Sequence, residues 1–230
     1  MLWKLGAAVL AAGLVAAAAQ AEEYTDTKAG YRVTIPEGWT QTKHKGDDDL
    51  VVTSPNTRKT FGFCFVHDVP LPGTEGLSQA DLDERLTGKF PKSYWQAMFE
   101  QSDFESLVVE DAGEEKQNGR NTYFAVVTYK ELRRNHKFKT VVHILPGRSL
   151  HLTCNAYLEA YPREETAFEI FFDSFFPIDR GLISKGPERS VTLSSAPANT
   201  RQPNAETLAK QISAAISSAV QRSVPAQPRD

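Results

Sequence analysis

Two cysteines have the best-defined chemistry in this 230-residue chain. Cys64 and Cys154 delimit a loop of about 90 residues, and cross-linking a loop of this length stabilises a fold by up to about 4–5 kcal/mol. Both lie in predicted strands, which would be neighbours in a closed sheet, and neither has a Cys-x-x-Cys or metal-ligand spacing. The first 21 residues, described below, have the pattern of an export signal, and an even pair of cysteines in an exported protein is typically oxidised. We therefore predict a disulfide, with two separate buried thiols as the alternative.

Three histidines form a second candidate site. His143 and His151 flank a predicted turn at Pro146-Gly147, and His67 lies on another predicted strand. If they share a sheet face, their imidazoles could bind zinc or copper, which would make the His143/His151 face a metal- or small-ligand-binding surface. The alternative is that these are solvent-facing strand residues. No short ligand spacing supports a metal, so we predict no metal ligand and no cofactor.

The remaining acidic and nucleophilic residues form no recognisable catalytic motif. Asp47-Asp48-Asp49 lacks the ligand spacing and the glycine of a calcium loop, and Glu164-Glu165 is explained by the favourable position of acids at a helix start. Ser149 lacks the second glycine and the strand-to-helix setting of a nucleophile elbow. We therefore predict no catalytic residue and no enzymatic activity, with an enzyme built from dispersed residues as an alternative.

The first 21 residues have the pattern of a secretory signal peptide. Lys4 gives a positive start, residues 5–18 form a short apolar run, and Ala19-Gln20-Ala21 matches the small-x-small cleavage pattern. The run is too short and too rich in alanine for a transmembrane anchor. We expect residues 1–21 to be removed, giving a periplasmic or secreted protein with no transmembrane segment in the mature chain. The net charge of −3 gives no nucleic-acid-binding footprint.

Apolar patterning predicts the strands that must position these residues. Residues 31–35 alternate with period two and end at the turn cluster Pro36-Glu37-Gly38. Residues 49–54 form a second short strand. Residues 60–66 are apolar at successive positions, which is typical of a strand covered on both faces.

Two turns predict an antiparallel meander in the middle of the chain. Asn118-Gly119 is a strong hairpin signal, because both residues tolerate positive φ, and it joins predicted strands at 104–116 and 121–132. A second pair of strands is predicted around the Pro146-Gly147 turn. This pair comprises residues 137–145 and 150–157.

Three helices are predicted between and after these strands. Ser78 and Asp81 form a weak capping box for the first helix, and Pro91 opens the second. Pro162 opens the third, whose aromatic side chains recur at helical spacing and should form a wall of the core. These side chains are Phe168, Phe171, Phe172 and Phe175. The order of elements predicts an α+β fold.

The composition predicts one domain followed by a tail. After the domain, Gly, Pro, Ser and Thr predominate, and then Leu208, Ile212 and Ile216 recur at helical spacing. Such a helix could dock on its own domain or on a partner. The predicted segments are a domain at 22–180, a flexible linker at 181–203, an amphipathic tail helix at 204–221 and a disordered C-terminus at 222–230.

Two segments resemble one known family. Tyr31-Arg32-Val33-Thr34-Ile35-Pro36-Glu37-Gly38-Trp39 resembles the opening of PsbP-like proteins, in which a Y-x-x-x-x-P-x-G-W segment starts the domain. Phe172-Asp173-Ser174-Phe175, on a helix after the last strand, resembles the end of that domain, and the similarity spans residues 24–179. The resemblance implies an antiparallel β-sheet sandwiched between helical layers. It also implies an accessory, assembly or chaperone-like binding role without conserved catalytic residues.

These observations together predict a class of function. We expect a non-enzymatic, exported binding or accessory protein of the bacterial cell envelope that acts through protein–protein interaction. The alternatives are a periplasmic protein that binds a metal or small ligand on the His143/His151 face, and an enzyme without a known motif.

Overall fold

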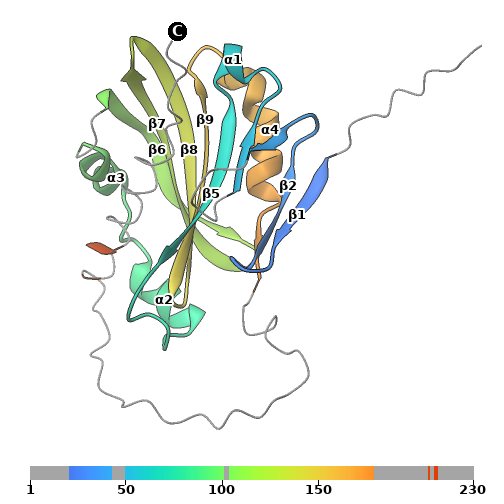
Figure 1. Cartoon of the computed structure of the whole chain (residues 1–230). Coiled ribbons are helices and arrows are strands. Elements are labelled where there is room, and N and C mark those ends of the chain that lie inside the picture. Colours follow the sequence, from blue (N-terminus) through green and yellow to red (C-terminus); the bar gives the residue numbers. More distant parts are fainter. Residues whose placement is uncertain (1–20, 43–49, 101–103, 179–206, 208–209, 212–230) are drawn as a thin grey trace, which may run out of the picture.

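The computed structural model of the chain describes residues 21–42, 50–100, 104–178, 207 and 210–211. These residues form two antiparallel sheets and a few short helices (Figure 1). The predicted signal peptide up to residue 20, Asp47-Asp48-Asp49, the linker and the C-terminal end lie outside the described residues. Of the predicted tail helix, residues 207, 210 and 211 are described, and all three are helical.

The larger sheet contains seven of the described strands in the order β3-β4-β5-β9-β8-β7-β6. The sheet is open, with β3 and β6 at its edges, so the closed sheet considered from the sequence is wrong for the described strands. The central strands β5 and β9 pair directly even though most of the domain separates them in sequence. The strands are β3 (Thr40–Thr42), β4 (Leu50–Thr53), β5 (Phe63–Pro70), β6 (Glu105–Gln117), β7 (Arg120–Glu131), β8 (Arg134–Leu145) and β9 (Arg148–Tyr157).

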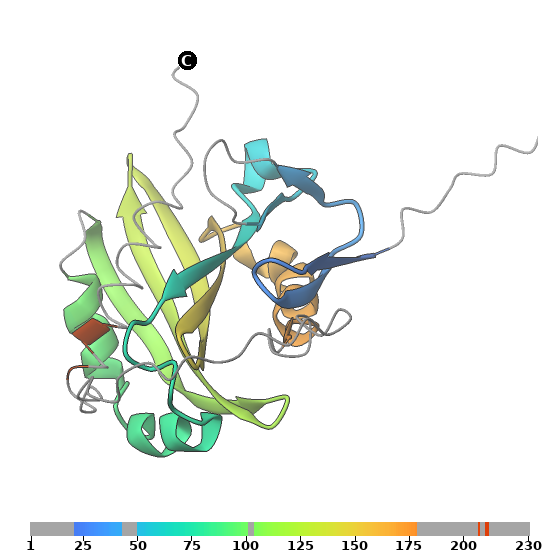
Figure 2. The ribbon, with the colours of Figure 1, turned by 60° about the horizontal axis from the view of Figure 1, so that its bottom comes forward.

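A small sheet and one helix cover one face of the large sheet, and two short helices cover part of the other face. Figure 2 shows α4 with β1 and β2 on one side, and α2 and α3 on the other. The smaller sheet has the order β1-β2-β10. The bounds are β1 (Glu22–Asp26), β2 (Tyr31–Ile35), β10 (Phe176–Pro177), α1 (Thr57–Thr60), α2 (Gln79–Leu86), α3 (Lys92–Phe99) and α4 (Tyr161–Asp173).

This arrangement confirms the α+β class and the antiparallel sheet. It does not confirm a sandwich between full helical layers, because most of the regular structure is strand. Two of the covering helices, α2 and α3, have eight residues each. On the α4 face, β1, β2 and β10 supply much of the cover.

The helix starts follow the predicted local chemistry. The Ser78 hydroxyl accepts from the Asp81 N–H, and the Asp81 carboxylate accepts from the Ser78 N–H, so the capping box is complete. Pro91 is the N-cap of α3, and Pro162 lies in the first turn of α4. The helix α1 was not predicted, because its four residues show no apolar periodicity.

Two apolar cores lie on opposite faces of the large sheet. The α4-side core includes Trp39, whose ring meets Phe168 edge-on at 5.8 Å, and all four predicted α4-region phenylalanines are buried in it. The α2/α3-side core is built around Trp95 and Phe99, whose rings stack at 5.9 Å. Each of these buried side chains contributes on the order of 1.5–3 kcal/mol. The strands β5, β8 and β9 are therefore covered on both faces, whereas β3 and most of β6 are exposed.

Candidate functional site

The predicted disulfide is present at the centre of the large sheet. Cys64 on β5 lies directly opposite Cys154 on β9, with their Cα atoms 4.1 Å apart. Both cysteines are fully buried on the α4 face. The bridge joins neighbouring strands from distant parts of the sequence, so its role in the described fold is structural.

The face that His143 and His151 were considered to share is not formed, and the alternative of solvent-facing histidines is also wrong, because His67, His143 and His151 are all buried. His143 lies opposite Leu150 on the α4 face, where its ring is 4.7 Å from the ring of Phe175. His151 lies opposite Val142, so it points to the other face. Side chains alternate along a strand, and the register offsets the two histidines by one position. Among the described residues, no group of three or more His, Cys, Asp or Glu side chains is placed to hold a metal ion.

The structure instead brings Ser149 and His151 together. The Ser149 hydroxyl and the His151 Nε2 are 2.7 Å apart, and His67 lies directly across the strand pair from His151. Both members of the pair are almost fully buried. Burial, with the nearby His67 and His143, lowers the pKa of His151 to about 3, so its imidazole is neutral at pH 7. An inaccessible, weakly basic imidazole suits a structural hydrogen bond better than general-base catalysis.

The acidic pair at the start of α4 also has a structural explanation. Glu164 is buried, and its Oε1 accepts a hydrogen bond of 2.8 Å from the Ser54 hydroxyl. Glu165 is exposed. The two carboxylates therefore differ in environment, and Glu164 ties the helix start to the end of β4.

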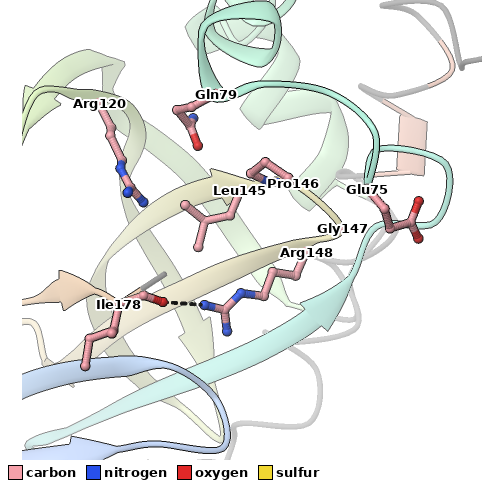
Figure 3. Close-up of a pocket in the computed structure, with 8 residues that line it drawn as sticks. All are labelled: Glu75, Gln79, Arg120, Leu145, Pro146, Gly147, Arg148 and Ile178. Atoms are coloured by element: carbon pink, nitrogen blue, oxygen red, sulfur yellow. Dashed lines mark hydrogen bonds between the residues drawn. The ribbon is translucent and has the colours of Figure 1, made fainter. Parts of the chain in front are cut away.

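A cavity of about 420 Å³ opens at the end of the sheet where the β8–β9 turn lies. Figure 3 shows its lining residues, which come from the loop before α2, the first residue of α2, the start of β7, the β8–β9 turn with the strand ends beside it, and the chain after β10. They are Glu75, Gln79, Arg120, Leu145, Pro146, Gly147, Arg148 and Ile178. The volume is in the range of small-ligand sites.

Arg148 forms the floor of this cavity. Its side chain is buried, and its guanidinium donates to the carbonyls of Ala29, Gly30 and Ile178. The Asp68 carboxylate lies 3.5 Å from the guanidinium. Arg148 thus joins the β1–β2 turn to the point where the described domain ends, and it holds a positive charge under the cavity.

A different surface feature lies at the opposite end of β8. The β7–β8 turn consists of Leu132 and Arg133, with φ values of 46° and 69°. Leu132 is 69% exposed, and the Arg134 guanidinium lies 4.6 Å from the centre of the Tyr157 ring. Leu158, which is also partly exposed, donates its N–H to the Asn135 carbonyl beside this turn. We name Leu132, Arg133 and Arg134 the hairpin tip.

A comparison with family models decides the family. The PsbP model matches residues 19–176, which include all the strands and helices described above except the last residue of β10. The chain belongs to the PsbP family. The opening and closing segments that suggested this family from the sequence form β2 and the end of α4. No helix in the described part of this PsbP-family chain is long and apolar enough to cross a membrane.

Solved structures similar to this PsbP-family chain come from several bacteria. The solution structure of cyanobacterial PsbP (CyanoP) from Synechocystis sp. PCC 6803 is 21% identical with a TM-score of 0.45, over 75% of this chain and 98% of that one. LpqN, described as involved in cell envelope biogenesis of Mycobacterium tuberculosis, is 12% identical with a TM-score of 0.44, over 70% of this chain and 91% of that one. The Pseudomonas aeruginosa protein PA94, of unknown function, is 13% identical with a TM-score of 0.44, over 69% of this chain and 98% of that one. A search of curated proteins found no match.

Neither of the two surface sites could be predicted from a sequence motif. Gln79, Arg120 and Arg148 come from three separated segments, so no motif spacing connects them. The hairpin tip lacks the Asn-Gly pair that marks such turns. Its one visible signal is an apolar residue, Leu132, that ends the predicted strand 121–132 and is followed by two arginines.

Proposed function

We propose that this protein is an exported, non-enzymatic accessory protein of the bacterial cell envelope, and that it binds another envelope protein. It works in the periplasm or outside the cell. The hairpin tip makes the contact. The partner surface that fits this tip has an apolar cleft for Leu132 with carboxylates around it for the neighbouring arginines.

The conformation of the hairpin tip carries this proposal. Left-handed backbone is unfavourable for Leu132 and Arg133, at about 1 kcal/mol or more for each residue, and Asn-Gly would relieve it. The strained turn presents a leucine that is 69% exposed. Strain of this kind clusters at functional sites, and an exposed apolar side chain beside a cation is typical of protein interfaces.

Two further observations support export and a binding role. The signal-peptide pattern of residues 1–21 and the buried disulfide both fit an oxidising compartment. The Ser149–His151 pair is buried and neutral at pH 7, which favours binding over hydrolysis as the activity of the domain.

Site-specific photo-crosslinking in the native bacterium tests the proposal. A crosslinker at position 132 should trap one defined envelope protein. A crosslinker at Ile170, which is 39% exposed on α4, is the matched control and should not trap it. If position 132 gives no adduct, or if both positions trap the same proteins, the hairpin tip is not the contact surface. N-terminal sequencing of the mature protein should begin at Glu22.

The double variant Leu132→Asn with Arg133→Gly separates stability from function. It installs the residues that this turn geometry favours, so the variant should fold at least as stably as the parent protein. It should nevertheless lose the partner in native pull-downs. Retention of the partner by this variant would contradict the proposed contact.

A further inference from the structure

The cavity beside the β8–β9 turn contains three chemically distinct features that face one space. Figure 3 shows the Arg120 guanidinium and the Gln79 carboxamide pointing into the cavity, whereas the Glu75 carboxylate points away from it. Leu145, Pro146 and Ile178 supply apolar lining between them. We propose that this cavity binds the C-terminal residue of a polypeptide that ends in an apolar side chain.

The first feature is a guanidinium that no described residue neutralises. Arg120 begins β7 directly after the Asn118-Gly119 turn, and its side chain makes no hydrogen bond or ion pair with any other described residue. Arg148 lies below it, where the Asp68 carboxylate at 3.5 Å already compensates its charge and backbone carbonyls accept from its guanidinium. The planar fork of donors on Arg120, which has no such counter-ion among the described residues, suits a carboxylate, because two parallel N–H···O bonds can form.

The second feature is a buried acceptor. The Gln79 Nε2 donates to the Asp83 Oδ1 at 2.8 Å and to the Ile144 carbonyl at 2.9 Å. Both partners are acceptors, so the carboxamide cannot be flipped without losing these bonds. The Gln79 Oε1 is thereby held in place, and it is buried without a hydrogen-bond partner among the described residues. A ligand that supplies an N–H would satisfy it.

The third feature is the apolar lining. Leu145 and Ile178 offer aliphatic surface, and Pro146 sets the β8–β9 turn that closes the cavity on one side. The terminal residue of a polypeptide carries a carboxylate, an amide N–H and a side chain, all three attached to one Cα. These three groups match the guanidinium, the carboxamide oxygen and the aliphatic surface, respectively.

This site is independent of the hairpin tip. The tip lies at the β7–β8 turn and the cavity at the β8–β9 turn, which are opposite ends of β8. A failure of one assignment therefore leaves the other standing. The same ligand chemistry also occurs in a free N-acylated amino acid, so the test must distinguish a peptide from a small carboxylate.

Binding measurements on the mature protein test the proposal. The probes are acetyl-Gly-Gly-Leu with a free carboxylate, the same peptide with a C-terminal amide, and N-acetyl-leucine. We expect the amide to bind about 10- to 100-fold more weakly than the acid, because it loses the charge-assisted bonds. A preference for the peptide over N-acetyl-leucine of about tenfold or more, roughly 1.4 kcal/mol, supports a polypeptide terminus.

Two substitutions of Arg120 and one control assign the carboxylate partner. Arg120→Gln should weaken binding of the acid by about 10- to 100-fold, and Arg120→Lys should restore part of it, because the charge remains and the fork is lost. Arg163→Gln, at an exposed position of α4, is the matched control and should leave binding unchanged. Unfolding curves confirm that each variant is folded.

Four outcomes would overturn the proposal. The first is the absence of saturable binding of the acid peptide at millimolar concentrations. The second is equal binding of the acid and the amide, and the third is unchanged binding by the folded Arg120→Gln variant. Equal binding of N-acetyl-leucine and the peptide would reassign the cavity to a small carboxylate and would also overturn the assignment to a polypeptide terminus.

Discussion

Three buried histidines should make this protein sensitive to mild acid. His136, His143 and His151 are at most 2% exposed. Burial lowers the pKa of His136 to about 4 and the pKa of the other two to about 3, against about 6.5 in an unfolded chain. The charge of Arg120 lowers the pKa of His143 further in the same direction. All three imidazoles are therefore neutral in the folded protein at pH 5.

The direction of this pH effect on stability follows from proton uptake by the histidines. Between about pH 6.5 and pH 4 the unfolded chain binds protons at these three histidines and the folded protein does not, so the free energy of unfolding falls as the pH falls. From pH 7 to pH 5 each histidine accounts for a loss of about 2 kcal/mol, or about 6 kcal/mol together. The pKa of Glu131 is raised by burial, so its protonation in the folded state offsets a part of this loss. The free energy of unfolding of a typical domain is about 5–15 kcal/mol in total, so a loss of this size is a large part of it.

Urea unfolding at pH 7, 6 and 5 measures this effect. The free energy of unfolding should fall steeply, and in a His143→Gln variant the fall should be about 2 kcal/mol smaller. Val141→Ala, on the same strand and equally buried, removes no ionisable group, so it should lower stability at every pH and keep the full fall. A fall of less than about 2 kcal/mol in the parent protein would refute the reasoning, because it would mean that the folded histidines accept protons near their ordinary pKa.

Three other perturbations test the structural roles assigned above. Cys64→Ala with Cys154→Ala should lower the free energy of unfolding by up to about 4–5 kcal/mol, and the parent protein should show the same loss when urea unfolding is repeated with a reductant. Arg148→Met should cost about 3–5 kcal/mol in the same assay, because the ion pair between the buried guanidinium and the partly exposed Asp68 carboxylate is broken and several carbonyls lose a donor; a loss below about 1 kcal/mol would contradict the role of this side chain. Leu132→Asn with Arg133→Gly should raise the melting temperature by several degrees, corresponding to about 2 kcal/mol, and a lower melting temperature would show that the turn is not strained.

Local signals in the sequence were enough to predict much of the fold. The Asn118-Gly119 hairpin, the Ser78–Asp81 capping box and the proline starts of α3 and α4 are all observed, because each depends on neighbouring residues only. The pairing of β5 with β9 could not be derived in this way. It depends on which strands meet across the sheet, and the cysteine pair was its one sequence signal.

The candidate sites were harder to predict, for two physical reasons. The facing of His143 and His151 depends on register, and a shift of one residue moves a side chain to the other face. The cavity joins side chains such as Gln79 and Arg120 that only the folded sheet brings together. The strained turn at Leu132 was missed because sequence preferences describe the commonest solution, and this turn departs from it.

The disulfide divides the chain of the domain into a closed loop and two segments that lie outside this loop. The chain between Cys64 and Cys154 is a closed ring that contains α2, α3 and every buried residue of the core beneath them. The core beneath α4 instead draws β1, β2 and α4 from the two open arms of the chain. The arms can therefore detach while the ring stays closed, so amide protons of α4 should exchange before those of β7 under native conditions.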